Sequence, residues 1–579
     1  MPIPSFILPS APAVVGGSVY GATVNSTNLA FTADTISFTR GGEAYRTNSS
    51  GQVQRVPYNL FTYSNDFSNA AWVKSYCTLT PNATTAPDGS NTGWSLADNA
   101  TLGSHGFTGT LVSSVVNTYS VYAKANTANW LWLYFAAMTG GSAWFNLTTG
   151  VVGSFESNVI PTITPVGNGW YRCSITKASS LSSSGTGLMV TTGSGITSHS
   201  GTGNSIYIWR AQVVEGTQPL NYFPTTDRLN VPRVDYTIPN TPCLLLEPQR
   251  TNLFTYSEDA SSWSSTSNVS ISTNTTTAPN GTLTADSIIE NTSAGFHYRG
   301  VVPGNAGTYA ITIYVKPNGR NWVYLTTYDG SADRGAYFNV ATGVVGTINA
   351  GVTAKITPAA NGFYRCEIIA SPVAGFSATL QLATADNTRS YTGDGTSGVY
   401  VWGAQCEVGA YSTSYIATGS ASVTRLVDNF SRSNVYTNGL ISASGGTWVV
   451  HLFNNFAYTR DAGINGFFLS DSSTGSQNSL SFRNTGGPGS RLSIQKFIGT
   501  TNTDLYVTTT DIVKAALKWN GTSVDVFVNG TKVVVASAFT YTALEYLAHS
   551  VNGDVPKYIQ HMALYNSPLS DAECIVLTT

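Results

Sequence analysis

The chain has 579 residues, too many for a single hydrophobic core, and only 10% of them are Asp, Glu, Lys or Arg. Gly, Ser, Thr, Asn and aromatic residues fill the deficit, which excludes long helices rich in Ala, Leu, Glu and Lys and favours strands joined by tight turns. The formal net charge is −2 without any basic block, which argues against nucleic-acid binding, and no run of about 18 apolar residues predicts a membrane span.

The N-terminal segment, residues 1–57, is rich in Pro, Gly and Thr and carries only weak strand patterns. Prolines interrupt its apolar start and no Lys or Arg precedes that start, so we expect no secretory signal peptide. A segment this short and open cannot bury a core of its own. We therefore expect an extended anchor that packs on another domain or on a partner.

A long block of sequence is duplicated. The motif NLFTYS occurs at residues 59–64 and again at residues 252–257, and further blocks recur in the same order. These blocks are Ala86-Pro87 and Ala278-Pro279, residues 145–153 and 338–346, residues 168–173 and 361–366, and Trp209 and Trp402. Ordered repeats of this kind indicate that one structural unit is present twice.

Each copy of the repeat alternates short strand patterns with turns. The segments TYSVYAKA and TYAITIYVKP alternate in polarity, and an Asn-Gly turn precedes WYRCSI in one copy and FYRCEII in the other. Many short strands in a unit of this length favour a two-sheet jelly roll, which we predict for residues 58–226 and again for residues 251–419. Residues 227–250 carry several prolines and predict an extended connector.

Residues 420–579 have a different pattern. Asn-Gly pairs at residues 520–521 and 529–530 separate segments of alternating polarity, which predicts a three-stranded antiparallel meander. Ser570 and Glu573 have the spacing of a capping box, which predicts one short terminal helix. The chain is therefore predicted to be all-β apart from its end.

Several motifs resemble those of known virion proteins. The segments NLFTYSNDFSNAAW and NLFTYSEDASSW, with the run from Val231 to Phe254, resemble β-sandwich modules of bacteriophage tail fibres and other virion fibres, which are similar to carbohydrate-binding jelly rolls. The segments ALKWNGTSVDVFVNGTKV and YIQHMALYNSPLSDAE resemble a concanavalin A-like, laminin-G-type sandwich. From about residue 38 to the end, the resemblance implies two tandem jelly-roll β-sandwiches followed by a concanavalin A-like β-sandwich.

The same resemblance implies a role on the virion surface. Such fibres and adhesins contact host surface polysaccharide and are often oligomeric, and a virion protein released by lysis needs no signal peptide. We expect a homo-oligomer, a trimer or a dimer, joined to other virion proteins through the N-terminal segment. The sequence lacks the glycine-rich shaft or long coiled coil of many tail fibres, so a head-fibre or capsid-decorating role stays open.

The candidate glycan-binding residues are aromatic, because sugar rings stack their apolar faces on aromatic side chains. Trp130, Trp132 and Tyr134 alternate along one predicted strand and so share one face, as do Trp322 and Tyr324 in the second copy. The opposite face of each strand is apolar too, and a two-layer sandwich buries only one face. The aromatic face must therefore meet a domain, a subunit or a ligand, and packing is the more frequent use of such rings.

Two arginines are further candidates. Arg172 and Arg365 occupy equivalent positions of the repeat, each directly after an aromatic pair within a predicted strand. A guanidinium at these positions could bind a carboxylated sugar, and the competing interpretation is a structural contact within the sandwich.

No catalytic or metal-binding motif is apparent, and we expect the chain not to be an enzyme. The closest glutamates, Glu247 and Glu258, are too far apart for the paired-carboxylate strand motif of glucanases. There is no HExxH zinc motif and no Cys-x-x-Cys pair, so the six cysteines are expected to be free thiols. We expect no cofactor, although loop oxygens could hold a structural calcium ion.

Three functions follow from the sequence, in order of preference. The first is a non-catalytic bacteriophage appendage, a tail or head fibre, that presents its sandwiches to host cell-surface glycans. The second is a purely structural capsid-decorating protein whose aromatic faces mediate packing between copies. The third is a glycan depolymerase, which would need carboxylates brought together by folding.

Overall fold

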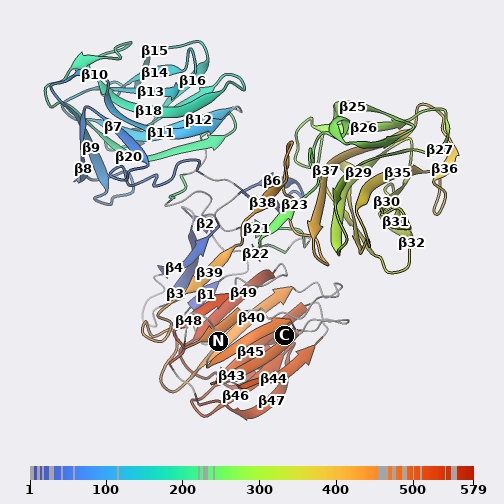
Figure 1. The fold of residues 1–579 in the computed structure, drawn as a ribbon. Helices are drawn as coiled ribbons and strands as arrows, with labels where there is room; N and C mark the ends of the chain where they lie inside the picture. Colours follow the sequence, from blue (N-terminus) through green and yellow to red (C-terminus); the bar gives the residue numbers. More distant parts are fainter. Residues whose placement is uncertain are drawn as a thin grey trace. The chain divides into compact units, whose positions relative to one another are not determined.

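The computed structural model describes residues 6–8, 14–15, 18–24, 31–40, 43–56, 59–113, 116–219, 222–225, 233–238, 241–453, 467–471, 478–484, 492–499, 501–508, 512–540, 543–549 and 557–579. The chain divides into two compact units. The first-sandwich unit consists mainly of Pro57–Val231, and the second unit combines Met1–Val14, Ser18–Val56 and Pro232–Thr579. Strands make up nearly all of the regular structure (Figure 1), so the predicted all-β class is confirmed.

The first copy of the repeat is a sandwich of two six-stranded antiparallel sheets. One sheet contains, in spatial order, β15 (Val151–Phe155), β14 (Ser142–Asn146), β13 (Trp130–Ala136), β18 (Ser183–Thr191), β11 (His105–Ser113) and β7 (Trp72–Ser75). The other contains β16 (Val159–Gly167), β17 (Trp170–Lys177), β12 (Asn117–Ala125), β20 (Ser205–Glu215), β9 (Gly93–Asp98) and β8 (Cys77–Thr84). Apolar side chains between the sheets, such as Leu131, Val121 and Ile208, form the core.

The second copy has the same strand order in both of its sheets. One sheet contains β32 (Val344–Ile348), β31 (Asp333–Asn339), β30 (Trp322–Tyr328), β35 (Phe376–Ala383), β28 (Tyr298–Gly304) and β24 (Ser265–Ser267). The other contains β33 (Thr353–Pro358), β34 (Tyr364–Ala370), β29 (Tyr309–Asn318), β37 (Gly398–Val408), β26 (Ala285–Glu290) and β25 (Val269–Thr276). The identical order confirms that one sandwich design occurs twice.

The recurring NLFTYS motif has a structural cause. Asn59, buried at its start, donates from Nδ2 to the carbonyl oxygens of Ala211 at 3.0 Å and Phe223 at 3.2 Å. Asn252 makes the equivalent bonds to the carbonyls of Ala404 and Ile416 in the second copy. A buried side-chain amide must be hydrogen-bonded, so this asparagine fixes the beginning of each sandwich against its end.

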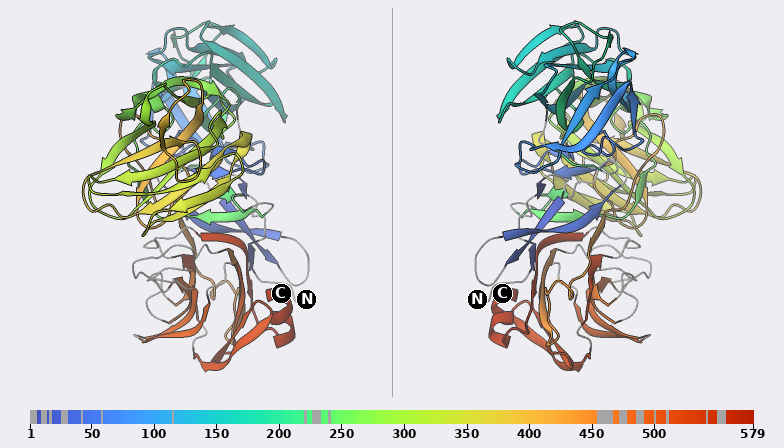
Figure 2. Two further views of the ribbon diagram at one scale, coloured as in Figure 1. Left: turned by 90° about the vertical axis from the view of Figure 1, so that its right-hand side faces the viewer. Right: turned by 90° about the vertical axis from the view of Figure 1, so that its left-hand side faces the viewer.

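The C-terminal part is a two-layer sandwich around a core that includes Trp448, Phe482 and Trp519, and Figure 2 shows both layers nearly edge-on. One layer contains β49 (Lys557–Tyr565), β40 (Gly446–Phe453), β45 (Ile512–Trp519), β46 (Ser523–Val528) and β47 (Thr531–Ala538). The other contains β39 (Asn429–Arg432), β48 (Tyr546–His549), β41 (Phe467–Ser470), β42 (Ser479–Asn484), β43 (Leu492–Ile498) and β44 (Thr501–Thr508).

Two local predictions for this part are confirmed. Strands β45, β46 and β47 form the antiparallel meander expected from the Asn-Gly turns. Helix α1 (Asp571–Thr578) begins at a capping box, in which the hydroxyl of Ser570 accepts from the amide of Glu573 and the carboxylate of Glu573 accepts from the amide of Ser570.

The six cysteines are free thiols.

The N-terminal segment differs from the extended anchor that we expected. Strand β1 (Phe6–Leu8) pairs with β49, β3 (Ser18–Val24) pairs with β4 (Phe31–Thr39), and β4 pairs with β39. Of the two expected packing modes, on another domain or on a partner, the strand pairing shows the first. Removing these strands would therefore take pairing partners from the C-terminal sandwich.

Five buried charged side chains join the segments that flank the second sandwich. Arg40 comes from the N-terminal segment, Arg233 and Glu247 from the connector, and Arg425 and Asp428 from the segment after the sandwich. Arg40 lies 2.8 Å from Asp428, whose other oxygen contacts Arg233. Glu247 lies 2.6 Å from Arg233 and 2.9 Å from Arg425. We call this set the arginine cluster.

Both carboxylates of the arginine cluster are charged at neutral pH. Burial alone would raise the pKa of Asp428, but Arg233, Arg40 and Arg425 outweigh burial and lower it to about 2. Burial is likewise outweighed at Glu247, where Arg425 and Arg233 hold the pKa below its ordinary value. Each buried charge in the cluster therefore has an opposite charge beside it, as buried ions require.

Candidate functional site

The predicted aromatic row lies on the outer face of the first sandwich. Leu131, Leu133 and Phe135 of β13 point into the core, so Trp130, Trp132 and Tyr134 share the other face, as predicted. There they form a separate cluster with Trp144 of β14 and Met189 of β18. The sheet thus carries a second, smaller apolar layer outside its core.

The rings of this outer cluster pack on one another. The Trp132 ring is nearly parallel to that of Trp144, with 5.6 Å between centroids and 5° between planes, and it stacks on Tyr134 at 4.6 Å. As a result Trp132 is only 8% exposed, while Trp130 and Tyr134 are half-buried. The three rings therefore do not form an open platform, and only Trp130 and Tyr134 keep surface that a ligand could reach.

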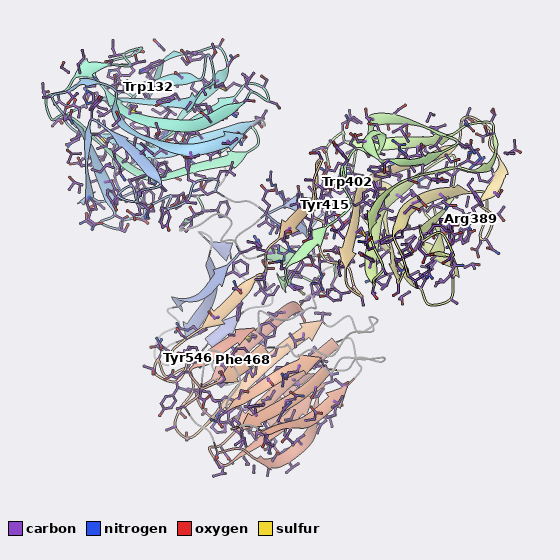
Figure 3. All side chains as sticks on the ribbon, viewed as in Figure 1. Trp132, Arg389, Trp402, Tyr415, Phe468 and Tyr546 are labelled. Carbon is purple, nitrogen blue, oxygen red and sulfur yellow. The ribbon has the colours of Figure 1, made fainter. Side chains whose placement is uncertain are left out.

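The second copy has replaced much of this cluster with polar groups. Tyr324, in the place of Trp132, packs at 4.5 Å on Tyr337 and is 2% exposed, while Trp322 is half-buried. The guanidinium of Arg389 lies 4.6 Å from the Tyr324 ring and donates to Gln381, the counterpart of Met189. Figure 3 labels Trp132 in the first sandwich and Arg389 in the second. Tyr324 is thus a packing residue.

The pair Tyr134 and Gly187 provides a test of this packing. The Tyr134 ring lies against Gly187, where an added Cβ would be only 2.0 Å from the ring, and the second copy has Thr326 and Thr379 at these positions. We expect Gly187→Thr to destabilise the first-sandwich unit by about 1–3 kcal/mol because it overpacks the site. When Tyr134→Thr is combined with Gly187→Thr, the loss of unfolding free energy in urea denaturation should be at least about 1 kcal/mol smaller than the sum of the two single losses. Strictly additive costs would contradict this packing.

Arg172 and Arg365 lie at equivalent places on the second sheet of each sandwich. Arg172 donates to Ser120 Oγ at 3.1 Å with its guanidinium 5.4 Å from the Tyr122 ring. Arg365 donates to Thr413 O at 2.7 Å and to Thr312 Oγ1 at 3.2 Å. Both arginines thus make structural contacts, but Arg365 also lines a cavity.

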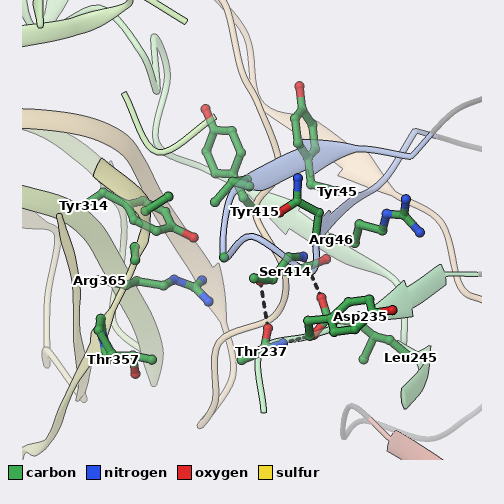
Figure 4. Close-up of a pocket in the computed structure, with 18 of the residues that line it drawn as sticks. Tyr45, Arg46, Asp235, Thr237, Leu245, Tyr314, Thr357, Arg365, Ser414 and Tyr415 are labelled. Carbon is green, nitrogen blue, oxygen red and sulfur yellow. Dashed lines mark hydrogen bonds between the residues drawn. The ribbon is translucent and has the colours of Figure 1, made fainter. Parts of the chain in front are cut away.

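That cavity, of about 860 Å³, belongs to the second unit (Figure 4). Its walls come from the hairpin of β5 (Tyr45–Thr47) and β6 (Val53–Arg55), from connector residues 235–237, from strands β29, β33 and β34, and from residues 412–415. The lining combines tyrosine rings with hydroxyl, carboxylate, ammonium and guanidinium groups. Concave sites with a few converging polar groups are the usual ligand sites of proteins.

The β5–β6 hairpin builds one wall because it is fastened to the second sandwich. Asn48 Oδ1 accepts from the amides of Ser50 and Gln52 and so closes the turn. Val53 donates its amide to Pro279 O at 3.1 Å and packs in one apolar cluster with Trp402 and Tyr415. The hairpin therefore covers part of a sheet face that would otherwise be open.

Three of the five tyrosines that line the cavity pack on one another. The Tyr45 and Tyr415 rings meet edge to face at 5.1 Å, and the Tyr314 and Tyr415 rings are perpendicular at 6.5 Å. Burial raises the pKa of Tyr45 and Tyr314 above the ordinary value, so both keep their phenolic protons at neutral pH. In Figure 4 the Tyr314 ring lies beside Arg365, and the Tyr45 side chain lies on the other side of Tyr415.

The polar side of the cavity is equally fixed. The Asp235 carboxylate accepts from the amides of Thr47 and Thr237, both at 2.7 Å, and burial raises its pKa. Ser414 donates its amide to Glu247 at 2.8 Å, and Arg233 donates to Tyr45 O at 3.1 Å. The arginine cluster therefore holds two walls of the cavity from behind, which preorganises it.

The sequence did not point to Tyr45, Asp235 or Tyr415 as site residues. Tyr45 and Asp235 lie in the segments predicted to be an anchor and a connector, and Tyr415 lies near the end of the second copy. Tyr45 and Asp235 lie beside Arg46 and near Arg233 in a chain that has few charges, whereas no charged residue lies within seven positions of Tyr415. The structure thus brings together residues far apart in sequence.

Within the described part of the chain, no group of three or more His, Cys, Asp or Glu side chains is arranged to hold a metal ion. Of the helices that the structure describes, none is long and apolar enough to cross a membrane.

Comparisons with known proteins add a distant likeness. No family model matches the chain, and no curated protein matches it. Among solved structures it is similar to the N-terminal CBM22-1–CBM22-2 tandem domain of Xyn10C from Paenibacillus barcinonensis, with 11% sequence identity and a TM-score of 0.21. The similarity covers 61% of this chain and 97% of that chain. A TM-score this low carries no conclusion about function.

Proposed function

We propose that this chain is a non-catalytic glycan-binding protein carried on the surface of a bacteriophage particle, as a tail or head fibre. The cavity of the second unit is the observation that carries the proposal. The half-buried ring of Tyr45 can contact the apolar face of a sugar, while Arg365 and Ser414 supply hydrogen-bonding groups beside it. A fixed ring flanked by fixed polar groups suits a ligand that the protein binds without changing it chemically.

The carboxylates at the cavity favour binding over cleavage. Glycoside hydrolysis needs two carboxyl groups about 5–9.5 Å apart that act on opposite sides of the scissile bond. Both oxygens of Asp235 already accept backbone amides, and the second lining carboxylate, Glu367, is 6% exposed. Neither group is presented as a free acid or base toward a substrate.

The particle-borne role is supported by the resemblance of the repeated modules to virion fibre modules. Tandem sandwiches and a charge-poor composition rich in Thr, Ser and Tyr suit an exposed appendage. Attachment to other virion proteins through the N-terminal segment, and assembly into a trimer or dimer, remain predictions that belong to this proposal.

A structural decorating role is the second candidate, and the outer aromatic cluster favours it. Trp132 and Trp144 are already buried by stacking, which is how packing surfaces are built, and Trp130 and Tyr134 beside them could extend that surface onto another copy. In this case the cavity would have no ligand.

One binding assay separates these functions. The full-length protein is tested against a panel of neutral and acidic bacterial capsular and O-antigen polysaccharides by biolayer interferometry, and each mixture is assayed for new reducing ends. We expect binding to at least one polysaccharide with no reducing ends released. Absence of binding across the panel would leave the packing role, and release of reducing ends would establish a depolymerase.

A further inference from the structure

The charged groups that line the cavity differ in how far a ligand can reach them. Lys355 is exposed, and Arg365 and Arg46 are half-buried. The acids are far less accessible, because Asp235 is 2% exposed and Glu367 is 6% exposed. The charge that a ligand meets on entering the cavity is therefore positive.

The two acids also have compensating neighbours in the protein. Asp235 accepts two backbone amide hydrogen bonds, which stabilise its charge. Glu367 lies directly opposite Lys355 in the register of β33 and β34. Both acids are therefore balanced by groups of the protein itself.

Arg365 is held in a fixed orientation at the cavity wall. Its Nη2 donates to Thr413 O and Thr312 Oγ1, and its guanidinium lies 5.8 Å from the centre of the Tyr314 ring. A guanidinium fixed in this way loses little entropy on binding, and its planar shape matches a carboxylate better than an ammonium does.

The first copy of the repeat is an internal comparison for this chemistry. Arg172 and Thr164 are paired there as Arg365 and Thr357 are in the second copy. At the next pair, however, Thr162 and Ser174 replace Lys355 and Glu367, and their hydroxyls bond to each other at 2.5 Å. Of the two copies, only the second has an exposed cation, Lys355, one strand pair away from the arginine at this repeat position.

From these observations we infer that the cavity binds a sugar residue bearing a carboxylate, such as a uronic acid within an acidic polysaccharide. Arg365 and Lys355 contact the carboxylate, and the half-buried ring of Tyr45 contacts the sugar. This inference deepens the proposed function and rests on it.

The test uses full-length protein and the acidic polysaccharides that bind in the panel, each before and after chemical reduction of its carboxyl groups to alcohols. We expect reduction to weaken binding at least 10-fold, and binding to weaken as the salt concentration rises. Equal binding of the reduced polymer, or tighter binding of a neutral or phosphate-bearing polymer, would overturn the carboxylate and leave glycan binding intact. If no polysaccharide binds, the proposed function itself fails.

Charge variants locate the effect in the second copy. Lys355→Gln removes the charge of an exposed side chain without placing a second acid opposite Glu367, and we expect at least a 10-fold loss of binding to the acidic polymer only. Thr162→Gln, at the equivalent exposed position of the first copy, should have no effect. Arg365→Gln against Arg172→Gln repeats the comparison. Equal effects in both copies, or none, would overturn the assignment to this cavity.

Discussion

Replacing Asp428 with alanine is expected to lower the free energy of unfolding of the second unit by about 3–5 kcal/mol. The change leaves Arg40 and Arg233 buried beside each other without the carboxylate that both of them contact. An uncompensated buried charge costs far more than the net contribution of the intact pair. Urea denaturation followed by tryptophan fluorescence measures the loss.

A surface ion pair of the N-terminal segment, which also carries Arg40, is the control. Glu43 contacts Arg55 with its side chain 47% exposed, and such pairs contribute at most about 1 kcal/mol. We therefore expect Glu43→Ala to change stability by no more than about 1 kcal/mol. If the two variants lose similar amounts, the arginine cluster does not hold the second unit together.

The effect of Asp428 should also depend on pH. Its pKa falls from an ordinary 3.8 to about 2 on folding, so the stabilisation is complete above the unfolded value and is lost as the pH falls through the folded value. The stability difference between the wild type and Asp428→Asn is therefore expected to shrink from pH 4 to pH 2, by roughly the amount that this pKa shift supplies. A constant difference would show that Asp428 does not act through its charge.

Filling the cavity is the second large expected effect. Thr357 lines the cavity on edge strand β33, and a tryptophan there would occupy part of the space needed by a sugar. We expect Thr357→Trp to weaken polysaccharide binding by about 100-fold or more, equivalent to about 2.7 kcal/mol. Equilibrium titration of the polysaccharide into each variant measures the change.

The repeat supplies a matched control for this variant. Thr164 occupies the same place on edge strand β16 of the first copy, where its side chain is exposed. We expect Thr164→Trp to bind like the wild type. Unchanged binding in both variants would place the ligand elsewhere, and Trp130→Ala with Trp322→Ala would then show whether the outer aromatic faces hold it.

Local patterns predicted most of the fold. Ordered repeats such as the NLFTYS motif predicted two like sandwiches, because each copy keeps the buried asparagine that fixes its two ends. Asn-Gly turns and the capping box at Ser570 predicted the meander and the helix, since these signals act over a few residues. The pairing of β4 with β39 was not predictable, because weak strand patterns do not specify a distant partner.

The candidate site was predicted only in part. Alternation along β13 correctly placed Trp130, Trp132 and Tyr134 on one face, but it could not show that Trp144 from the next strand would stack on Trp132 and bury it. Arg365 was a candidate from sequence, whereas the cavity around it depends on a hairpin and a connector from other regions of the chain. Such sites arise from tertiary contacts, which no local pattern encodes.

Hydrogen exchange of the full-length protein, with and without a polysaccharide that it binds, tests most directly whether the second copy holds the ligand in its cavity. We expect slower exchange in β33 (Thr353–Pro358) and in the hairpin from Tyr45 to Arg55, with no change in β16 (Val159–Gly167). Protection confined to β13 and β14, or equal protection of β16 and β33, would contradict a glycan site in this cavity.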